Sequence, residues 1–203
     1  MPPVTQALLG LNIVVFALQG IFGYGIEANF ALWPPAQLDQ PMVPSFEIWQ
    51  LITYGFLHGS FMHVAFNMLA LWMFGRDVER ALGWRRYLQY YLTCVITAAL
   101  AQLLVMNLTS TPPYPTVGAS GGVFGLLLAY GLLFPRRIVM LLIPPIPMPA
   151  KWFVVLYGLL ELVLGVTGTQ SGVAHFAHLG GLAGGFFLLQ FWRGRWPFDS
   201  QRR

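Results

Sequence analysis

The chain has 203 residues, of which 57% are hydrophobic and 9% are charged, and its formal net charge at pH 7 is +4. Soluble domains carry about 25% charged residues, so the composition excludes an ordinary soluble domain and indicates an integral membrane protein whose solvent is the lipid bilayer. The positive charge does not by itself support nucleic-acid binding, and no nucleic-acid partner is expected. The single cysteine, Cys94, lies among apolar residues and is expected to be a small buried side chain.

Six apolar stretches are long enough to cross a bilayer, whose hydrocarbon core is about 30 Å thick. They predict transmembrane helices at 5–26, 57–75, 86–107, 118–134, 151–167 and 173–192. The first stretch has neither a basic flank nor a small-residue cleavage site, so it is predicted to be a span and not a signal peptide. The whole chain, 1–203, is predicted to form a single domain of the all-α membrane class.

All eleven basic residues fall on one side of this arrangement. They are Arg76, Arg80, Arg85 and Arg86 after the second span, Arg136, Arg137 and Lys151 after the fourth, and Arg193, Arg195, Arg202 and Arg203 after the sixth. The opposite connections contain acidic residues but neither Lys nor Arg. Because basic loops stay in the cytoplasm, both termini are expected to be cytoplasmic.

The connection between the first two spans, residues 27–50, is rich in proline and aromatic residues. A connection of this length is uncommon unless it has a function, and its apolar content predicts an outer loop that lies in the membrane interface. The proline-rich segment 109–115 is expected to be a short outer turn. The prolines Pro144, Pro145, Pro147 and Pro149 are expected to break up the inner connection before Lys151.

Polar residues lie near the outer ends of spans two, four and six. At 1.5 Å of rise per residue, His63, Ser120 and His178 lie about 20–24 Å from the basic residue that follows each span, and so about 6–10 Å below the outer surface. Polar groups at such a depth are costly unless they pair or face a water-filled cavity. Their common level therefore makes mutual pairing possible.

Small residues accompany these polar groups. Gly121 and Gly125 are four residues apart in span four, and Gly181 and Gly185 are four apart in span six. Small residues at this spacing let helix backbones touch in lipid. Ordinary helix packing explains each pair, and the same packing would bring the serine of span four toward the histidine of span six.

Ser120 lies in a glycine-rich segment that includes Gly118 and Gly121, where other groups can approach the hydroxyl closely. Serine becomes an effective nucleophile when a base such as a neutral imidazole accepts its proton, and His178 is the candidate base. Glu161 is the only acid inside a span, and we expect it in the inner half of span five. With no acid expected near the imidazole, the pair is predicted to be a catalytic dyad and not a triad.

An attacked carbonyl also needs donors for its developing negative charge. His63 and Asn67 are four residues apart and therefore share one helix face. Together with the backbone N–H of Ser120 at a helix N-terminus, they are candidates for an oxyanion hole.

Metal binding is the competing interpretation of the four histidines. His175 and His178 are three residues apart and could share an ion, but no acidic or thiol ligand accompanies them in the sequence. No metal or other cofactor is therefore expected. His58, His175 and Glu161 are expected to be buried structural residues, with a proton-relay or transport role as the alternative for Glu161.

Three segments, in order, resemble the motifs of the rhomboid intramembrane serine proteases. They are FLHGSFMHVAFN at 56–67, the GxSG sequence GASG at 118–121, and AHFAHLGG at 174–181 followed by Gly185. A GxSG sequence alone is a weak signal, but three ordered motifs on spans two, four and six are specific, and the resemblance extends over about residues 49–190.

The resemblance implies a six-transmembrane-helix rhomboid-like bundle in which Ser120 is the nucleophile and His178 the general base. It also implies that His63 and Asn67 stabilise the oxyanion, and that the substrates are single-span membrane proteins cut in or near their transmembrane helix. The family often has Trp-Arg where this chain has Trp49-Gln50, so the role of the arginine is not transferred to Gln50.

The compact chain without a targeting extension is expected in a bacterial inner membrane, with the active site open to the outer side. One alternative is a non-catalytic rhomboid-like protein that binds transmembrane helices. Another is a small transporter built around Glu161 and the histidines. The sequence leaves the natural substrate and the oligomeric state open.

Overall fold

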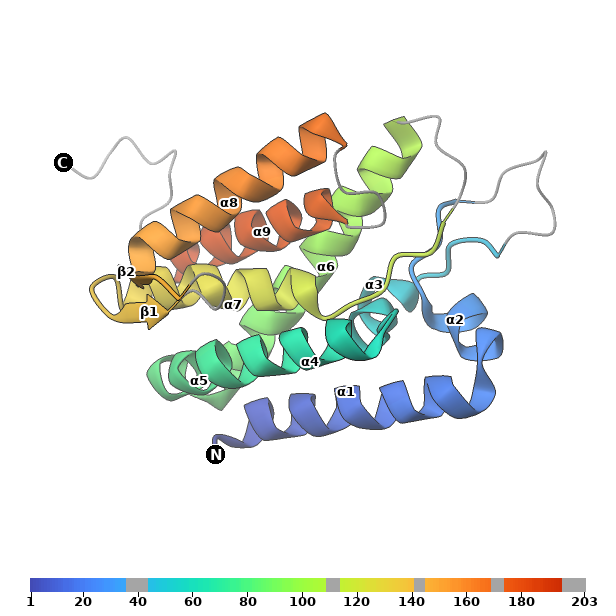
Figure 1. Cartoon of the computed structure of the whole chain (residues 1–203), viewed down its shortest axis with the longest axis horizontal. Coiled ribbons are helices and arrows are strands. Elements are labelled where there is room, and N and C mark those ends of the chain that lie inside the picture. Colours follow the sequence, from blue (N-terminus) through green and yellow to red (C-terminus); the bar gives the residue numbers. More distant parts are fainter. Residues whose placement is uncertain (36–43, 109–113, 141–144, 169–173, 195–203) are drawn as a thin grey trace.

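The computed structural model describes residues 1–35, 44–108, 114–140, 145–168 and 174–194. Most of these residues are helical (Figure 1). The α-helices are α1 (Pro3–Phe22), α2 (Tyr24–Phe30), α3 (Gln50–Thr53), α4 (Phe61–Ala70), α5 (Arg76–Leu82), α6 (Trp84–Leu108), α7 (Ser120–Leu133), α8 (Ala150–Thr167) and α9 (His175–Trp192). A 3-10 turn, Tyr54–Phe56, follows α3, and a π-helical segment, Leu71–Gly75, joins α4 to α5.

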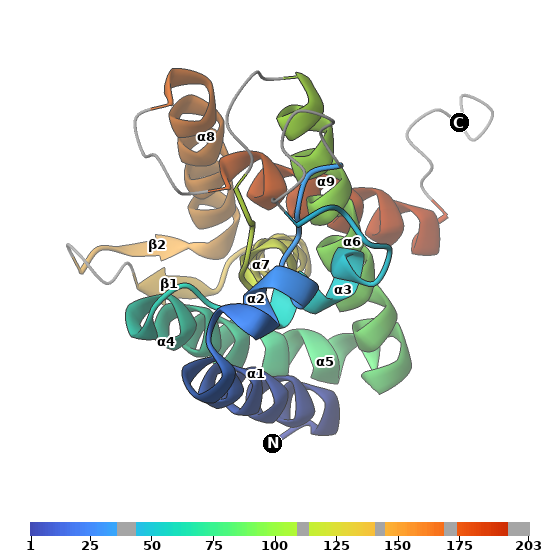
Figure 2. The same cartoon turned by 90° about the vertical axis from the view of Figure 1, so that its right-hand side faces the viewer.

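Helix α7 occupies the centre of the molecule. Seen end-on in Figure 2, it has α1, α4 and α5 on one side and α8 and α9 on the other, and α6 runs past it from the α8 side to the α5 side. Its sequence is apolar on all faces and most of its residues are buried, as expected for a helix with neighbours all round. The serine at its first position is therefore held inside the bundle.

Buried tyrosines fasten α6 to its neighbours. The Tyr90 hydroxyl donates to the carbonyl of Gly125 in α7 at 2.7 Å, and the Tyr54 hydroxyl donates to the carbonyl of Val95 in α6 at 2.8 Å. A buried phenol needs such a partner because an unpaired hydroxyl in an apolar interior is costly. Cys94 is fully buried in this core, as the sequence predicts.

Each of the six predicted segments contains a helix, but two differ from the expectation. Helix α1 ends at Phe22, before the predicted 26, because Gly23 adopts a φ of 56° and the chain turns into α2. The second segment is α4, the π-helical segment and α5 in succession, and its helical path continues to Leu82, beyond the predicted end at 75.

Three helices of the described part, α1, α6 and α8, are long and apolar enough to cross a membrane, and α7 is a shorter apolar helix. Together with the low charge content, they identify an integral membrane protein. The sequence analysis did not predict the short helices α2 and α3, nor the strands β1 (Ile138–Met140) and β2 (Pro147–Pro149), which pair antiparallel between α7 and α8. Strands of only three residues carry almost no periodic signal, and proline, present in β2, is unusual within strands.

The start of α1 is bound to α5 through Glu79, a buried residue. Its carboxylate accepts from the N–H groups of Val4 and Thr5 at 2.9 and 2.7 Å and from the Thr5 hydroxyl at 2.6 Å. The first N–H groups of a helix have no partner within the helix, so Glu79 supplies a partner for two of them.

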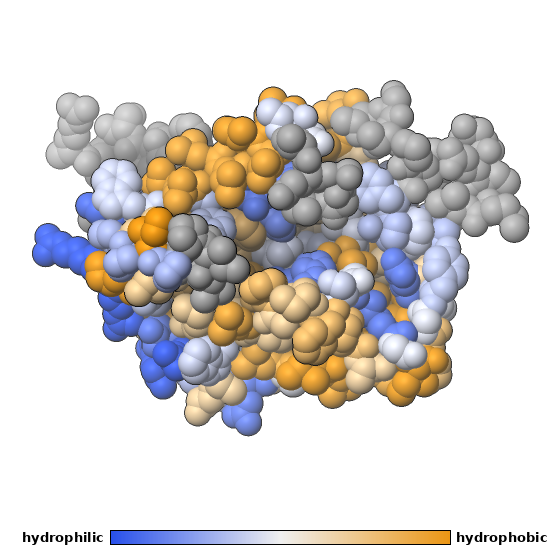
Figure 3. Space-filling model, in the orientation of Figure 1, coloured by the Kyte–Doolittle hydropathy of each residue, from blue (hydrophilic) through white to orange (hydrophobic). Residues whose placement is uncertain are grey.

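The start of α1, α5 and the β1–β2 pair lie at one end of the molecule (Figure 1). There Arg137 pairs with Asp77 at 2.7 Å, and so links the segment after α7 to α5. Hydrophilic residues gather at the same end in Figure 3, whereas apolar surface covers much of the remaining face.

At the other end, Gln50 anchors the connection that was predicted to lie in the interface. Its side chain is 1% exposed; it accepts from the Trp33 N–H at 3.1 Å and donates to the carbonyls of Asn29 and Ser45 at 3.4 Å. A neutral amide thus forms hydrogen bonds to the beginning of the connection, at Asn29 and Trp33, and to its later part, at Ser45. Within this predicted loop, residues 36–43 lie outside the described residues, as do residues 109–113 of the predicted outer turn and Pro144 of the inner connection.

Candidate active site

Ser120 is the first residue of α7 and follows a glycine that the geometry requires. Gly118 has a φ of 134°, in a region that L-residues rarely adopt. A Cβ atom at this position would lie 2.8 Å from Nε2 of His63 and 3.5 Å from Oγ of Ser120. Glycine therefore lets the chain bring Ser120 next to His63.

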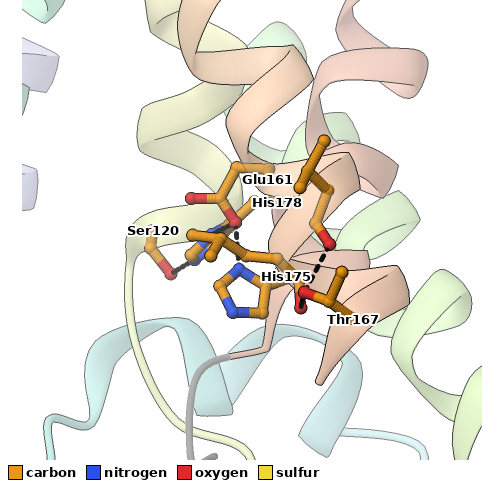
Figure 4. Close-up of polar contacts among 7 residues, drawn as sticks. Ser120, Glu161, Thr167, His175 and His178 are labelled. Atoms are coloured by element: carbon orange, nitrogen blue, oxygen red, sulfur yellow. Dashed lines mark hydrogen bonds and ion pairs between the residues drawn. The ribbon is translucent and has the colours of Figure 1, made fainter. Parts of the chain in front are cut away.

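The hydroxyl of Ser120 lies against the imidazole of His178, in the first turn of α9. Nε2 of His178 is 2.7 Å from Oγ of Ser120 (Figure 4). The backbones of α7 and α9 touch below this pair, because a Cβ on Gly181 would collide with the carbonyl of Gly121. The close approach of two glycines brings the two side chains within hydrogen-bonding distance.

The other two glycines of the predicted pairs face α6. A Cβ on Gly125 would collide with the sulfur of Cys94, and one on Gly185 would collide with the hydroxyl of Tyr90. These small residues let α7 and α9 both pack closely on α6, so α6, α7 and α9 form the rigid support of the serine and the histidine.

Phe124 is a site residue that the sequence analysis missed. Its ring stacks on the imidazole of His178, with centroids 4.3 Å apart and planes 10° from parallel. Phe124 comes four residues after Ser120 on α7, so the two share one face of the helix. That spacing is a signal that could have identified it.

Glu161 overturns one expectation. Its Oε2 lies 2.8 Å from Nδ1 of His178 and 2.6 Å from Nδ1 of His175 (Figure 4). The expectation that no acid lies near the imidazole is therefore wrong. The sequence count measured depth along each helix separately and gave no offset between α8 and α9.

Within the described part of the chain, Glu161, His175 and His178 form a group that could hold a metal ion, since their ligand atoms lie within 4.8 Å of one another. Zinc sits about 2.0–2.1 Å from each ligand atom, which places the ligands of one tetrahedral ion about 3.3 Å apart. The contacts of Glu161 Oε2 at 2.6 and 2.8 Å are shorter. They have the lengths of charge-assisted hydrogen bonds.

The predicted oxyanion residues lie beside the serine. The N–H of Gly59 donates to Nδ1 of His63 in a long hydrogen bond of 3.5 Å, which favours the tautomer with the proton on Nε2, the nitrogen that faces Gly118. Asn67 donates one amide hydrogen to the carbonyl of His63 at 3.0 Å and has a second hydrogen. Both side chains line the same cavity as Ser120.

His58 lies behind this group and is 2% exposed. Its backbone N–H donates to the Gln19 side chain at 2.9 Å, which ties the site to α1, and its ring meets that of His63 edge-on at 5.0 Å. His58 thus packs against the site from the α1 side, whereas the ring of His175 contacts the carboxylate of Glu161.

A cavity of about 660 Å³ opens onto the serine and the histidines. Its polar wall contains His63, Asn67, Ser120 and His178, and its apolar walls come from α4, β1 and α8, among them Phe66, Val139, Phe153 and Tyr157. Figure 3 shows a recess with hydrophilic residues inside it, between apolar surfaces above and below. A long apolar chain can therefore lie against polar, reactive groups.

Comparisons with known proteins place these residues in context. The Rhomboid domain family matches residues 45–194. The chain is 34% identical over 188 residues to Rhomboid protease GluP of Bacillus subtilis. The aligned region covers 92% of this chain and 34% of the relative. It is 31% identical over 176 residues to the mitochondrial Rhomboid protein 1 of Saccharomyces cerevisiae, covering 86% of this chain and 49% of the relative.

A third relative is Rhomboid protease GlpG of Klebsiella pneumoniae, 30% identical over 189 residues, 92% of this chain and 62% of the relative. The chain thus spans between about a third and two thirds of these relatives' lengths. The family match extends over most of the chain and includes every residue of the site described above. The protein is therefore a member of the rhomboid family.

Proposed function

We propose that this protein is an intramembrane serine endopeptidase that cleaves single-span transmembrane proteins in or near their membrane helix. The observation that carries the proposal is the 2.7 Å contact between Oγ of Ser120 and Nε2 of His178 at the wall of the cavity. The rhomboid family is known for intramembrane serine proteases, and two of its relatives described above are named proteases.

In the proposed mechanism, Nε2 of His178 accepts the hydroxyl proton as Oγ of Ser120 attacks the scissile carbonyl. The negative charge that develops on the carbonyl oxygen is stabilised by the backbone N–H of Ser120 at the start of α7, Nε2–H of His63 and the second amide hydrogen of Asn67. His178 then protonates the leaving amine. Water hydrolyses the acyl-enzyme, with His178 again as the base.

The substrate must present an extended segment to this site, because the carbonyl groups of a helix in lipid are engaged in its own hydrogen bonds. The apolar walls that α4 and α8 contribute to the cavity suit a helix that arrives sideways from the membrane. Small or helix-breaking residues near the scissile bond would favour the local unwinding. Cleavage sites are therefore expected near the ends of the substrate helix.

The proposal includes six membrane spans, cytoplasmic termini and a site open to the outer side of a bacterial inner membrane. Two observations support it. The basic residues of the connections follow the positive-inside pattern, and each of the six apolar segments contains a helix. Water would then reach Ser120 from the outer side.

The test uses the purified chain in liposomes with a panel of single-span substrates and mass spectrometry of the products. We expect cleavage by the wild type and none by Ser120→Ala or His178→Ala, because each variant lacks one partner of the proton transfer. A fluorophosphonate probe should label wild-type Ser120. Undiminished cleavage by either variant would reject the assignment, and a protein that binds substrates without cleavage or labelling would be a non-catalytic helix-binding member of the family.

A further inference from the structure

We propose that Glu161 is a positioning residue that fixes the tautomer and orientation of His178, so that the site works as a Ser–His–Glu triad. This inference rests on the proposed protease function and extends it to α8, which contributes no residue to the predicted dyad. Glu161 and His178 are both buried, with 7% and 8% of their surface exposed.

The hydrogen-bond pattern at His178 carries the argument. A neutral imidazole has one N–H donor and one acceptor nitrogen, and an ionised carboxylate can only accept. Oε2 of Glu161 is 2.8 Å from Nδ1, so Nδ1 carries the proton. Nε2 then has its lone pair free, 2.7 Å from the hydroxyl that must be deprotonated.

The opposite tautomer would be unproductive. With its proton on Nε2, His178 would donate to the serine oxygen and could not remove the hydroxyl proton. Phe124 stacks on the ring face and fixes the plane of the imidazole but cannot choose between the two tautomers. Glu161 makes that choice, and its charge also stabilises the imidazolium that forms when the proton is transferred.

His175 holds the carboxylate in place. Its Nδ1 lies 2.6 Å from the same Oε2 atom, and its other ring nitrogen is buried without a hydrogen-bond partner among the described residues. The polar contact of this ring within the described structure is thus directed at Glu161. Two donors from the first turn of α9 compensate the cost of a buried carboxylate.

Close packing of α8 on α9 sets the level of this contact. One turn after Glu161, a Cβ on Gly165 would lie 3.1 Å from Cβ of His175. This glycine lets α8 lie directly against the start of α9. The carboxylate is therefore brought level with the two imidazoles by helix packing, as Figure 4 shows for the side chains.

The test is Glu161→Gln, which keeps the volume of the side chain but removes its charge. An amide can accept from Nδ1 or donate to it, so it no longer specifies the tautomer. We expect kcat to fall by about 10²-fold or more with little change in KM, because the loss affects proton transfer and not substrate binding. Labelling of Ser120 by a fluorophosphonate should slow in parallel.

Nitrogen-15 NMR of histidine-labelled protein in lipid measures the tautomer of His178 directly. A merely structural role of Glu161 would leave this tautomer unchanged. With four histidines in the chain, single substitutions can assign the His178 signals. We expect the Nδ1–H tautomer at His178 in the wild type and an increased Nε2–H share in Glu161→Gln. An Nε2–H tautomer in the wild type would overturn the proposal even if the variant did not fold.

Glu79→Gln is the matched control, since Glu79 is a buried glutamate remote from the serine. It should lower thermal stability but leave kcat of the folded protein unchanged. If the wild type cleaves, Ser120→Ala is inactive and Glu161→Gln has wild-type kcat, the positioning role is wrong while the protease function stands. If the wild type cleaves no substrate, the protease function fails, and the tautomer measurement still decides the role of Glu161.

Discussion

At the scale of single residues, the site combines the contact between Ser120 and His178 with side chains that are proposed to bind an oxyanion. Gly118 has a backbone conformation suited to glycine and lies against the His63 ring, so Ser120, His63 and Asn67 converge on one wall of the cavity. Oxyanion donors act strongly in such sites because they are already oriented before the charge develops. The donors should therefore contribute to kcat and not to substrate affinity.

Removal of one donor tests this at His63. We expect His63→Ala to lower kcat by roughly 10²–10³-fold with a smaller effect on KM, the usual cost of deleting one oxyanion donor. Steady-state cleavage in liposomes measures both constants. A kcat within a factor of two or three of the wild type would show that His63 lies outside the oxyanion hole.

At the scale of elements, the contact between α7 and α9 places the serine and the histidine. The helices approach until the carbonyl of Gly121 leaves no room for a Cβ on Gly181, and both rest on α6. In a membrane, where lipid competes equally for apolar side chains, such backbone contact is a main source of helix association. Any side chain at this contact separates the two helices and with them the reacting atoms.

Gly181→Ala should therefore lose both stability and activity. The new methyl group collides with a backbone carbonyl, which cannot rotate away, and overpacking of this kind costs typically about 1–3 kcal/mol. The matched control is Gly158→Ala in α8, where the nearest atom to a new Cβ is Leu182 Cδ1 at 3.7 Å. There the gain in helix propensity should leave stability equal or higher. Thermal unfolding in detergent compares the two, and equal melting temperatures would contradict the close contact.

At the scale of the whole molecule, α1 lies at the periphery and is joined to the bundle by a few polar contacts. Glu79 receives three hydrogen bonds from the first turn of α1, and Gln19 near its other end exchanges two with the backbone of His58. Hydrogen bonds of this kind stabilise the structure in lipid because unpaired polar groups cannot bond to water there. The position of α1 thus depends on both ends being held.

Glu79→Gln should release one end of α1. An amide oxygen is a weaker acceptor than a carboxylate, so we expect a loss of about 1–3 kcal/mol in the free energy of unfolding, with a preserved kcat for the protein that remains folded. Glu47→Gln, at an exposed position in the connection before α3, is the control and should leave stability unchanged. If Glu79→Gln and Glu47→Gln were equally stable, the carboxylate would not be what holds α1.

Much of this protein follows from its sequence alone. Composition indicates an integral membrane protein, apolar runs locate the helical segments, and motifs around Ser120 and His178 indicate the family, because hydropathy and local motifs need no knowledge of which helices are neighbours. The positions where the helices are interrupted were less predictable. The turn at Gly23 and the π-helical segment at Leu71–Gly75 depend on how the helices pack against their neighbours. The β1–β2 pair is too short for a periodic signal.

Only the tertiary structure placed Glu161 beside His178. Counting residues from the basic flanks gives the depth of a side chain along its own helix, but the offset between two helices is set by their packing. Here the contact of Gly165 with His175 sets that offset and brings a carboxylate to the imidazole. The sequence determined which residues could react, and the packing of α8 on α9 decided which acid holds the base in place, because that packing is a property of two surfaces and not of either segment.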